Sequence, residues 1–197
     1  MRILFIYPNI DAQIGFNYGI ASLSAVLKAG GHHTGLININ EKLQPIPSDN
    51  ELLERVAQFA PDIVGFSCVT TQFKHARRIA ELIKEKLGIP TIAGGVHATM
   101  VPQEVLETGV FDYACVGEAE EAFPELLERI ESGADTTTVA GIWAIKDGNI
   151  VQNNVRPFPR LEGLPRKDYS IFDFQRMIDA KNGWVGLMAG RGCPYRC

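Results

Sequence analysis

The chain has 197 residues, of which 46% are hydrophobic and 21% charged, and its net charge is −4. This composition is typical of a globular protein with a buried core. Its Lys and Arg residues form no basic stripe, which argues against nucleic acid as a partner. The opening apolar run, residues 3–7, is too short for a signal peptide or a membrane span, so we expect a soluble cytoplasmic protein.

Short apolar runs alternate with amphipathic stretches over residues 1–132. The runs predict strands at 2–7, 34–39, 62–68, 91–95 and 112–117, and the stretches predict helices at 18–29, 50–60, 72–87, 102–108 and 119–132. Apolar strands that are each followed by a helix indicate a parallel sheet covered on both faces. Right-handed crossovers then favour a flavodoxin-like (Rossmann-like), doubly wound α/β fold with five parallel strands in the order 2-1-3-4-5.

The pattern changes after Gly133. Residues 139–153 alternate around Asp147-Gly148, a turn dipeptide that predicts a β-hairpin, and residues 156–169 read as an extended, proline-rich linker. Residues 184–190 again have strand character. We therefore divide the chain into an α/β domain (1–135), a hairpin and linker (136–183), and the start of a further domain (184–197).

Polar residues and glycines stand at or just beyond the carboxyl ends of the predicted strands, where doubly wound sheets bind ligands. They are Ser67, Thr70, Thr71, Gly94, Gly95, His97, Gly117 and Glu118. Each has a structural alternative, because Ser and Thr cap helices, glycines serve tight turns and Glu is favoured at a helix N-terminus. Two adjacent glycines also leave room for a large flat ligand. The chain has neither a GxGxxG nor a GxxxxGK[ST] motif, which argues against dinucleotide and triphosphate sites.

Four short motifs together resemble a known domain: "PDIVGFS" (61–67), "GGVHAT" (94–99), "PQEVL" (102–106) and "GEAE" (117–120). They are similar to the cobalamin-binding domain of cobalamin-dependent radical S-adenosylmethionine enzymes. This family includes radical methyltransferases and anaerobic magnesium-protoporphyrin IX monomethyl ester cyclases. "RGCPYRC" (191–197) resembles the first loop of the family's radical barrel.

The resemblance implies a corrinoid site on one edge of the sheet. Corrinoid domains of the methionine-synthase type carry D-x-H-x-x-G, S-x-L and G-G, and here "SCV" (67–69) and Gly94-Gly95 match the last two. The loop that corresponds to the first motif has no histidine, which implies cobalamin with its own base displaced and no protein histidine beneath the cobalt. His97 lies at the right edge, but the family's motif does not make it a ligand. The implied cofactor-binding residues are Asp11, Gln13, Gly15, Ser67, Val69, Thr70, Thr71, Gly94, Gly95, His97, Gly117 and Glu118.

Cys193 and Cys197 match the first two cysteines of the family's C-x3-C-x2-C motif, whose thiolates hold a 4Fe–4S cluster. We therefore expect the sequence to end inside the cluster loop, so that cluster, S-adenosylmethionine and radical catalysis belong to the full-length enzyme and its radical barrel. A zinc half-site is the alternative, but no second Cys or His pair stands nearby. Cys68 and Cys115 lie in apolar runs and are expected to be buried, reduced thiols.

The predicted function is a cobalamin-binding module of an enzyme that methylates or oxidatively cyclises an unreactive carbon. A flavodoxin-like domain for flavin or another small ligand, and a domain that serves only interaction, remain alternatives because fold alone does not fix function. From the sequence we expect a bulky residue at Gly95 to abolish corrinoid binding and to leave thermal stability nearly intact.

Overall fold

The computed structural model describes residues 1–188 and 190–192, and its centre is one seven-stranded sheet in the order β2-β1-β3-β4-β5-β6-β7. The strands are β1 (Arg2–Pro8), β2 (His33–Ile39), β3 (Ile63–Ser67), β4 (Thr91–Gly94), β5 (Tyr113–Cys115), β6 (Ile142–Lys146) and β7 (Asn149–Val151). The helices are α1 (Tyr18–Ala29), α2 (Asp49–Phe59), α3 (Phe73–Leu87), α4 (Val96–Met100), α5 (Pro102–Glu107), α6 (Ala122–Ser132) and α7 (Phe174–Asp179).

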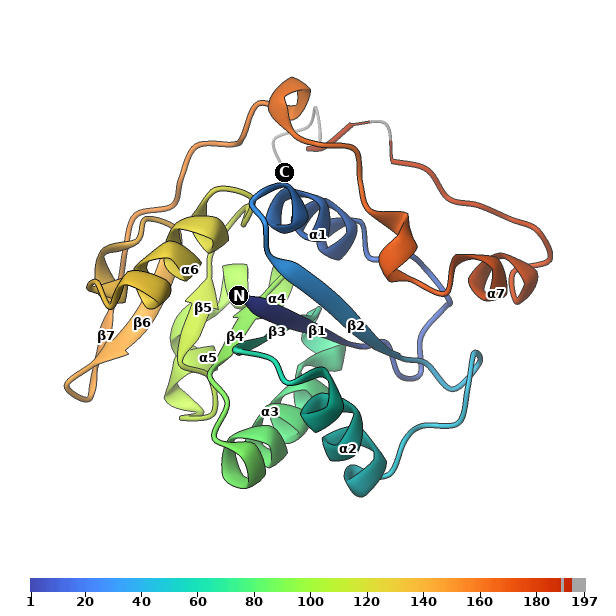
Figure 1. Cartoon of the computed structure of the whole chain (residues 1–197), viewed down its shortest axis with the longest axis horizontal. Coiled ribbons are helices and arrows are strands. Elements are labelled where there is room, and N and C mark those ends of the chain that lie inside the picture. Colours follow the sequence, from blue (N-terminus) through green and yellow to red (C-terminus); the bar gives the residue numbers. More distant parts are fainter. Residues whose placement is uncertain (189, 193–197) are drawn as a thin grey trace.

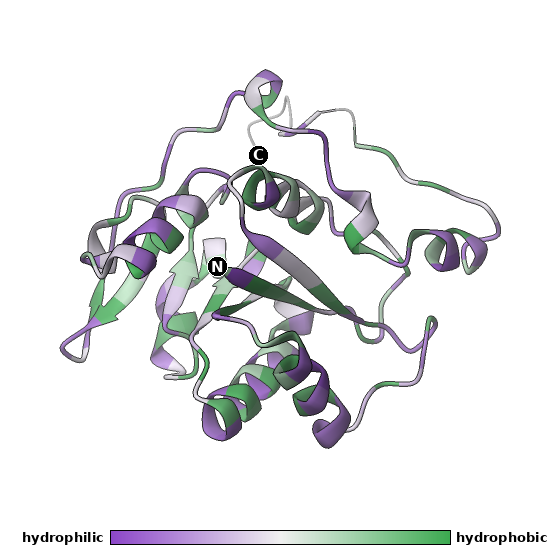
Figure 2. Cartoon of the chain, in the orientation of Figure 1, coloured by the Kyte–Doolittle hydropathy of each residue, from purple (hydrophilic) through white to green (hydrophobic). Residues whose placement is uncertain are grey.

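Strands β1 to β5 are parallel and in the order predicted from the sequence. Helices α1 and α6 cover one face of this sheet, and α2 and α3 cover the other (Figure 1). Successive residues of a strand point to opposite faces, so Ile3 and Phe5 join the core beneath α1 and α6, whereas Leu4 and Ile6 join the core against α2 and α3. The central strands β1, β3 and β4 are mostly apolar because both of their faces are buried, and hydrophilic residues gather on the outward sides of α2 and α3 (Figure 2).

The predicted hairpin forms, but it is not separate from the sheet. β6 pairs antiparallel with β5, and β7 pairs with β6, so the five-stranded sheet expected from the sequence has seven strands. The turn uses Asp147 and Gly148 with φ of 50° and 77°, as a type I′ turn requires. The hairpin covers the edge of β5, which would otherwise expose unpaired backbone groups.

Two other local predictions are wrong. Residues 96–100, which lie between the strand predicted at 91–95 and the helix predicted at 102–108 and were given no regular structure, form the short helix α4. Residues 184–188 and 190, expected to be a strand, have no regular secondary structure, and position 189 lies outside the described residues. An apolar run becomes a strand only where another strand offers its edge, and no such pairing involves these residues in the described part of the chain.

The linker returns across α1. The carboxylate of Asp168 accepts hydrogen bonds from Ser24 Oγ at 2.6 Å and Lys28 Nζ at 2.7 Å, both on α1. Beyond it, Phe172 and Met177 are buried in the core beneath α1. Within the described residues, none of the helices is both long and apolar enough to cross a membrane.

Candidate functional site

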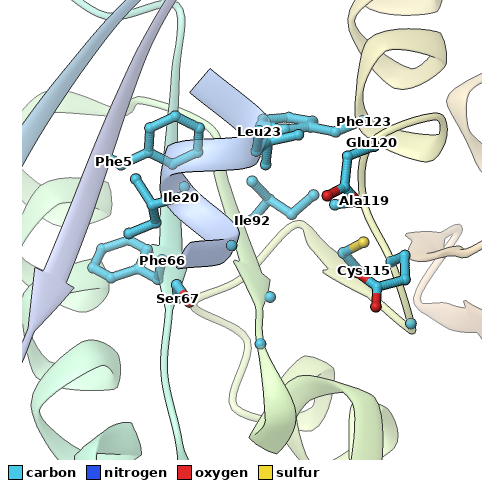
Figure 3. Close-up of a pocket in the computed structure, with 16 residues that line it drawn as sticks. Phe5, Ile20, Leu23, Phe66, Ser67, Ile92, Cys115, Ala119, Glu120 and Phe123 are labelled. Carbon is cyan, nitrogen blue, oxygen red and sulfur yellow. The ribbon is translucent and has the colours of Figure 1, made fainter. Parts of the chain in front are cut away.

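A cavity of about 140 Å³ lies between the sheet and helices α1 and α6, at the carboxyl ends of the strands (Figure 3). Its walls come from four strands, from the first turns of α1 and from the segment that leads into α6. The lining residues are Phe5, Gly19, Ile20, Leu23, Gly65, Phe66, Ser67, Ile92, Gly94, Gly95, Cys115, Gly117, Glu118, Ala119, Glu120 and Phe123. Five predicted site residues therefore line one cavity: Ser67, Gly94, Gly95, Gly117 and Glu118.

Two glycines on the floor of the cavity differ in the space around them. A Cβ at Gly65 would lie 3.2 Å from the ring of Phe5, so this ring occupies the space that a side chain would fill. A Cβ at Gly94 would meet Cys115 Cβ and Phe66 O at 3.8 Å, which is ordinary van der Waals contact. Gly94 therefore has room for a side chain, and any atoms beyond Cβ would compete with a ligand for the cavity.

Ser67 connects the end of β3 to the start of α1. Its Oγ accepts a hydrogen bond from Asn17 Nδ2 at 2.9 Å, while Asn17 Oδ1 caps the helix by accepting from Ile20 N at 3.0 Å. Because Ile20 and Ser67 both line the cavity, this bond holds a wall of α1 against the strand that forms the floor.

Gly95 is required by the backbone. Its φ of 90° is strained for any residue with a side chain, and a Cβ would lie 2.9 Å from the carbonyl oxygen of Cys68. Hydrogen bonds from Cys68 N to Gly94 O and from His97 N to Cys68 O, each 3.2 Å, join the ends of β3 and β4 at this point. The expectation that Gly95 tolerates a bulky residue without loss of stability is therefore wrong.

The wall of the cavity that leads into α6 carries a charged cluster. Glu120 is buried, and Arg191 donates hydrogen bonds to Glu118, Glu120 and Ser22. Burial alone raises the pKa of Glu120, but hydrogen bonds from Arg191 and Ser22 outweigh burial and hold this pKa below its ordinary value. Glu120 is thus ionised at neutral pH.

His97 lies outside the cavity. Its ring packs on Phe73 with the centroids 4.0 Å apart, and its Nδ1 is 3.3 Å from Thr70 Oγ1. Phe73 belongs to α3, which covers the opposite face of the sheet. Burial lowers the pKa of His97, so its imidazole is neutral, and its buried Nε2 has no hydrogen-bond partner among the described residues.

The loop between β1 and α1 also stays outside the cavity lining. Asp11 and Gln13 are exposed, and nothing lies within 4 Å of a Cβ built on Gly15. The loop is fixed by Gln72, a buried residue that the sequence reasoning missed. The Gln72 side chain accepts from Ile10 N at 3.2 Å and donates to Ile10 O at 2.6 Å.

Three exposed apolar side chains follow the ends of β3 and β4, and we call Val69, Val96 and Met100 the apolar rim. Their exposed fractions are 48%, 62% and 71%. Val69 and Val96 directly follow Cys68 and Gly95, which lie against each other. Val69 was predicted as a site residue, whereas Val96 and Met100 were not. Their position after the carboxyl end of a predicted strand is the feature of the sequence that could have identified them. Thr70 and Thr71, which follow Val69, are also exposed.

The two described thiols are buried. Burial raises the pKa of Cys68 from 9.0 to about 12, and burial together with the nearby carboxylates of Glu120 and Glu118 raises that of Cys115 to about 12. A thiol is nucleophilic as the thiolate, so both residues are inert in the native chain. This agrees with the buried, reduced thiols expected from the sequence.

A thiol-labelling experiment checks these pKa values. At pH 8 we expect a disulfide reagent to leave Cys68 and Cys115 unmodified in the native chain and to label both in denaturant, with the sites located by mass spectrometry. Labelling of Cys115 in the native chain at the rate of an exposed thiol would contradict this expectation.

The free energy of unfolding should fall as the pH rises from about 9 toward 12, because the unfolded chain releases thiol protons that the native chain retains.

Within residues 1–188 and 190–192, no cluster of three or more His, Cys, Asp or Glu side chains is arranged to hold a metal ion. Cys193 and Cys197, the predicted cluster ligands, lie outside the described residues.

Comparisons with known proteins agree with this geometry. A relative from Rubrivivax gelatinosus, an anaerobic magnesium-protoporphyrin IX monomethyl ester cyclase, is 33% identical over 213 residues and aligns with 100% of this chain but 38% of its own length. The cobalamin-dependent radical SAM methyltransferase TokK of Streptomyces tokunonensis is 30% identical over 146 residues, which is 70% of this chain and 21% of TokK. The chain thus spans less than half the length of these relatives.

Among solved structures, the cobalamin-dependent S-adenosylmethionine radical enzyme OxsB, with aqua-cobalamin and S-adenosylmethionine bound, has the same fold over 91% of this chain and 25% of OxsB. Its TM-score is 0.76 and its sequence identity 19%. The model of the B12 binding domain matches residues 12–127, which include every lining residue of the cavity except Phe5. The chain belongs to the B12-binding domain family.

Proposed function

We propose that this chain binds cobalamin at the carboxyl edge of its sheet, with the corrin ring over the apolar rim and the displaced nucleotide base inside the cavity. The observation that carries the proposal is the cavity itself, an apolar slot that passes from the strand ends down between α1 and α6. A flat aromatic base suits such a slot, because burial of apolar area stabilises it and no charged side chain stands on the glycine floor.

The residues present fit the cofactor. Gly94 keeps the floor free of a side chain, and Gly95 brings the backbone of β4 close to that of Cys68. His97, the histidine beside the apolar rim, is buried with its ring packed on Phe73, which supports binding without a protein ligand to cobalt. The apolar rim offers three side chains whose exposure is costly in water and which a corrin ring would cover.

When bound, cobalamin supplies a cobalt centre that carries a methyl group or exchanges electrons. The protein's part is to bind and orient the cofactor. Asn17 and Ser67 hold α1 against β3, and the rings of Phe5 and Phe123 give the slot apolar walls. Rigid strands and a helix N-terminus thus fix the walls before the ligand arrives, which reduces the entropic cost of binding.

We further propose that the domain serves a radical S-adenosylmethionine enzyme that methylates or oxidatively cyclises its substrate. The names of the cyclase and of TokK support this assignment, as does the "RGCPYRC" sequence at 191–197. In the whole protein, Cys193 and Cys197 would then contribute thiolates to a 4Fe–4S cluster.

An anaerobic titration with hydroxocobalamin tests the first proposal. We expect the chain to co-elute with corrinoid in gel filtration, and the absorbance spectrum to lack the signature of a nitrogen base bound to cobalt. Cobinamide, which lacks the nucleotide base, should bind more weakly because it leaves the cavity empty. Elution of protein without corrinoid would contradict the proposal.

A second experiment tests the assignment to a radical enzyme. The whole protein, reconstituted with iron and sulfide, should cleave S-adenosylmethionine reductively, and absence of cleavage would overturn the second proposal alone.

A further inference from the structure

The side chain of Arg191 joins the two walls of the cavity. Its Nη1 donates to Glu118 Oε2 at 2.7 Å, and its Nη2 donates to Ser22 Oγ at 2.9 Å and also to Glu120. Ser22 lies on α1, next to the lining residue Leu23, whereas Glu118 and Glu120 line the opposite wall. Glu120 is labelled in Figure 3, at the side of the cavity facing α1. One guanidinium group thus spans the two walls.

This contact requires an arginine. A guanidinium group is planar and has five donors in a fixed fork, so it can reach two carboxylates and a hydroxyl together. The side chain of Glu120 is 3% exposed and that of Arg191 is 19% exposed. Loss of the guanidinium would leave a buried carboxylate without its cation, which is strongly unfavourable.

Gly186 and Arg191 both contact α1, at positions one helical turn apart. A Cβ at Gly186 would lie 2.6 Å from the hydroxyl of Tyr18, so the backbone at Gly186 lies against the start of α1. Tyr18 and Ser22 are four residues apart and share one face of the helix. Residues 186 and 191 therefore contact neighbouring positions on the same wall, and the chain then continues toward Cys193.

We propose that Arg191 is a positioning residue that couples corrinoid in the cavity to the placement of residues 184–188 and 190–192. The inference rests on the proposed cobalamin function. A ligand between the two walls fixes the distance between them. This distance determines whether the guanidinium of Arg191 can contact both walls at once. Such coupling is reciprocal: if cobalamin orders the segment, the ordered segment raises the affinity for cobalamin by the same factor.

The test uses the complete 197-residue chain, hydroxocobalamin as the probe, and the variants R191Q and R191K. Arg156 offers a matched control, because it also pairs with two carboxylates, Glu121 and Glu125, outside the cavity lining. Two quantities are measured for each protein: the affinity for cobalamin, and the rate of amide hydrogen exchange in the peptide 184–192 with and without cobalamin.

In the wild type and in R156Q we expect cobalamin to slow exchange in this peptide. R191Q should bind cobalamin at least about fivefold more weakly and lose the slowing. R191K, which retains the charge without the fork, should be intermediate. If R191Q does not melt cooperatively, S22A replaces it, since it removes one arm of the contact and leaves Glu120 paired; a loss of slowing there supports the inference equally.

Two outcomes overturn the inference and can be told apart. Equal affinity and equal slowing in wild type and R191Q would refute the coupling while the proposed function stands. Failure of the wild-type chain to bind cobalamin would refute the proposed function, and the coupling with it.

Discussion

Replacement of Gly94 by leucine is expected to weaken cobalamin binding by roughly 100-fold while the chain keeps its fold. The backbone at Gly94 does not have a positive φ, and a Cβ there makes only ordinary contacts with Cys115 and Phe66. The added isobutyl group lies in the cavity and excludes the nucleotide base. The base that is excluded loses a burial comparable to that of one large apolar side chain, which contributes about 1.5–3 kcal/mol. A change of about 1.4 kcal/mol corresponds to a tenfold change in affinity.

Gly94→Ala is the matched control for this experiment. Its single methyl group meets atoms at van der Waals distance, so we expect an affinity within a few-fold of the wild type. Cobinamide distinguishes the contribution of the cavity to affinity from that of the apolar rim. Its binding should change little in Gly94→Leu, since it places no base in the cavity. Titrations of both corrinoids, with thermal melts of both variants, provide the measurement. Unchanged cobalamin affinity in Gly94→Leu would remove the cavity from the site.

The sequence predicted the parallel sheet well, for physical reasons that are visible in single elements. The helix expected at 72–87 occupies Phe73–Leu87 and ends at Gly88, which has a φ of 65°. Apolar residues at helical spacing, followed by a residue that accepts a left-handed conformation, leave few alternatives. Short elements carry less information. Helix α4 has five residues, and its exposed Val96 and Met100 give no amphipathic pattern.

The site was predicted in part, because strand ends can be located in a sequence and helix faces above them are harder to assign. Ser67 and Gly94 end β3 and β4, Gly117 lies just beyond β5, and all three were identified for that reason. Ile20 and Leu23 line the same cavity, but in the sequence they are ordinary apolar positions of an amphipathic helix. The register of α1 on the sheet, which decides whether such a residue fills the core or lines a cavity, depends on tertiary contacts.

Contacts between distant segments were the least predictable. Arg191 lies 73 positions from Glu118 and 71 from Glu120. Neither periodicity nor turn chemistry links residues at such separations. The "GEAE" and "RGCPYRC" segments were recognised as separate motifs of one family. Only the fold brings Arg191, the first residue of "RGCPYRC", against the two carboxylates of "GEAE".

Replacement of Gly95 by alanine should lower the free energy of unfolding by roughly 3–4 kcal/mol, even though the substitution adds only a methyl group. The backbone at Gly95 has φ 90° and ψ −172°, a combination nearly confined to glycine that costs a residue with a side chain about 1–3 kcal/mol. The methyl carbon would also lie 2.9 Å from Cys68 O and 3.1 Å from Cys68 N, which are backbone atoms that cannot rotate away. Overpacking of this kind adds about 1–3 kcal/mol.

Gly31 separates the two contributions, because its φ is 82° and nothing lies within 4 Å of a Cβ built there. Gly31→Ala should therefore show the backbone cost alone, about 1–2 kcal/mol. Denaturant unfolding of the two variants measures the difference, and equal losses would mean that the ends of β3 and β4 move apart easily. Because Gly95→Ala loosens the joint between these strand ends, loss of cobalamin binding in that variant reports a damaged scaffold. A test of the ligand's position therefore belongs at Gly94, where the chain has space for a side chain.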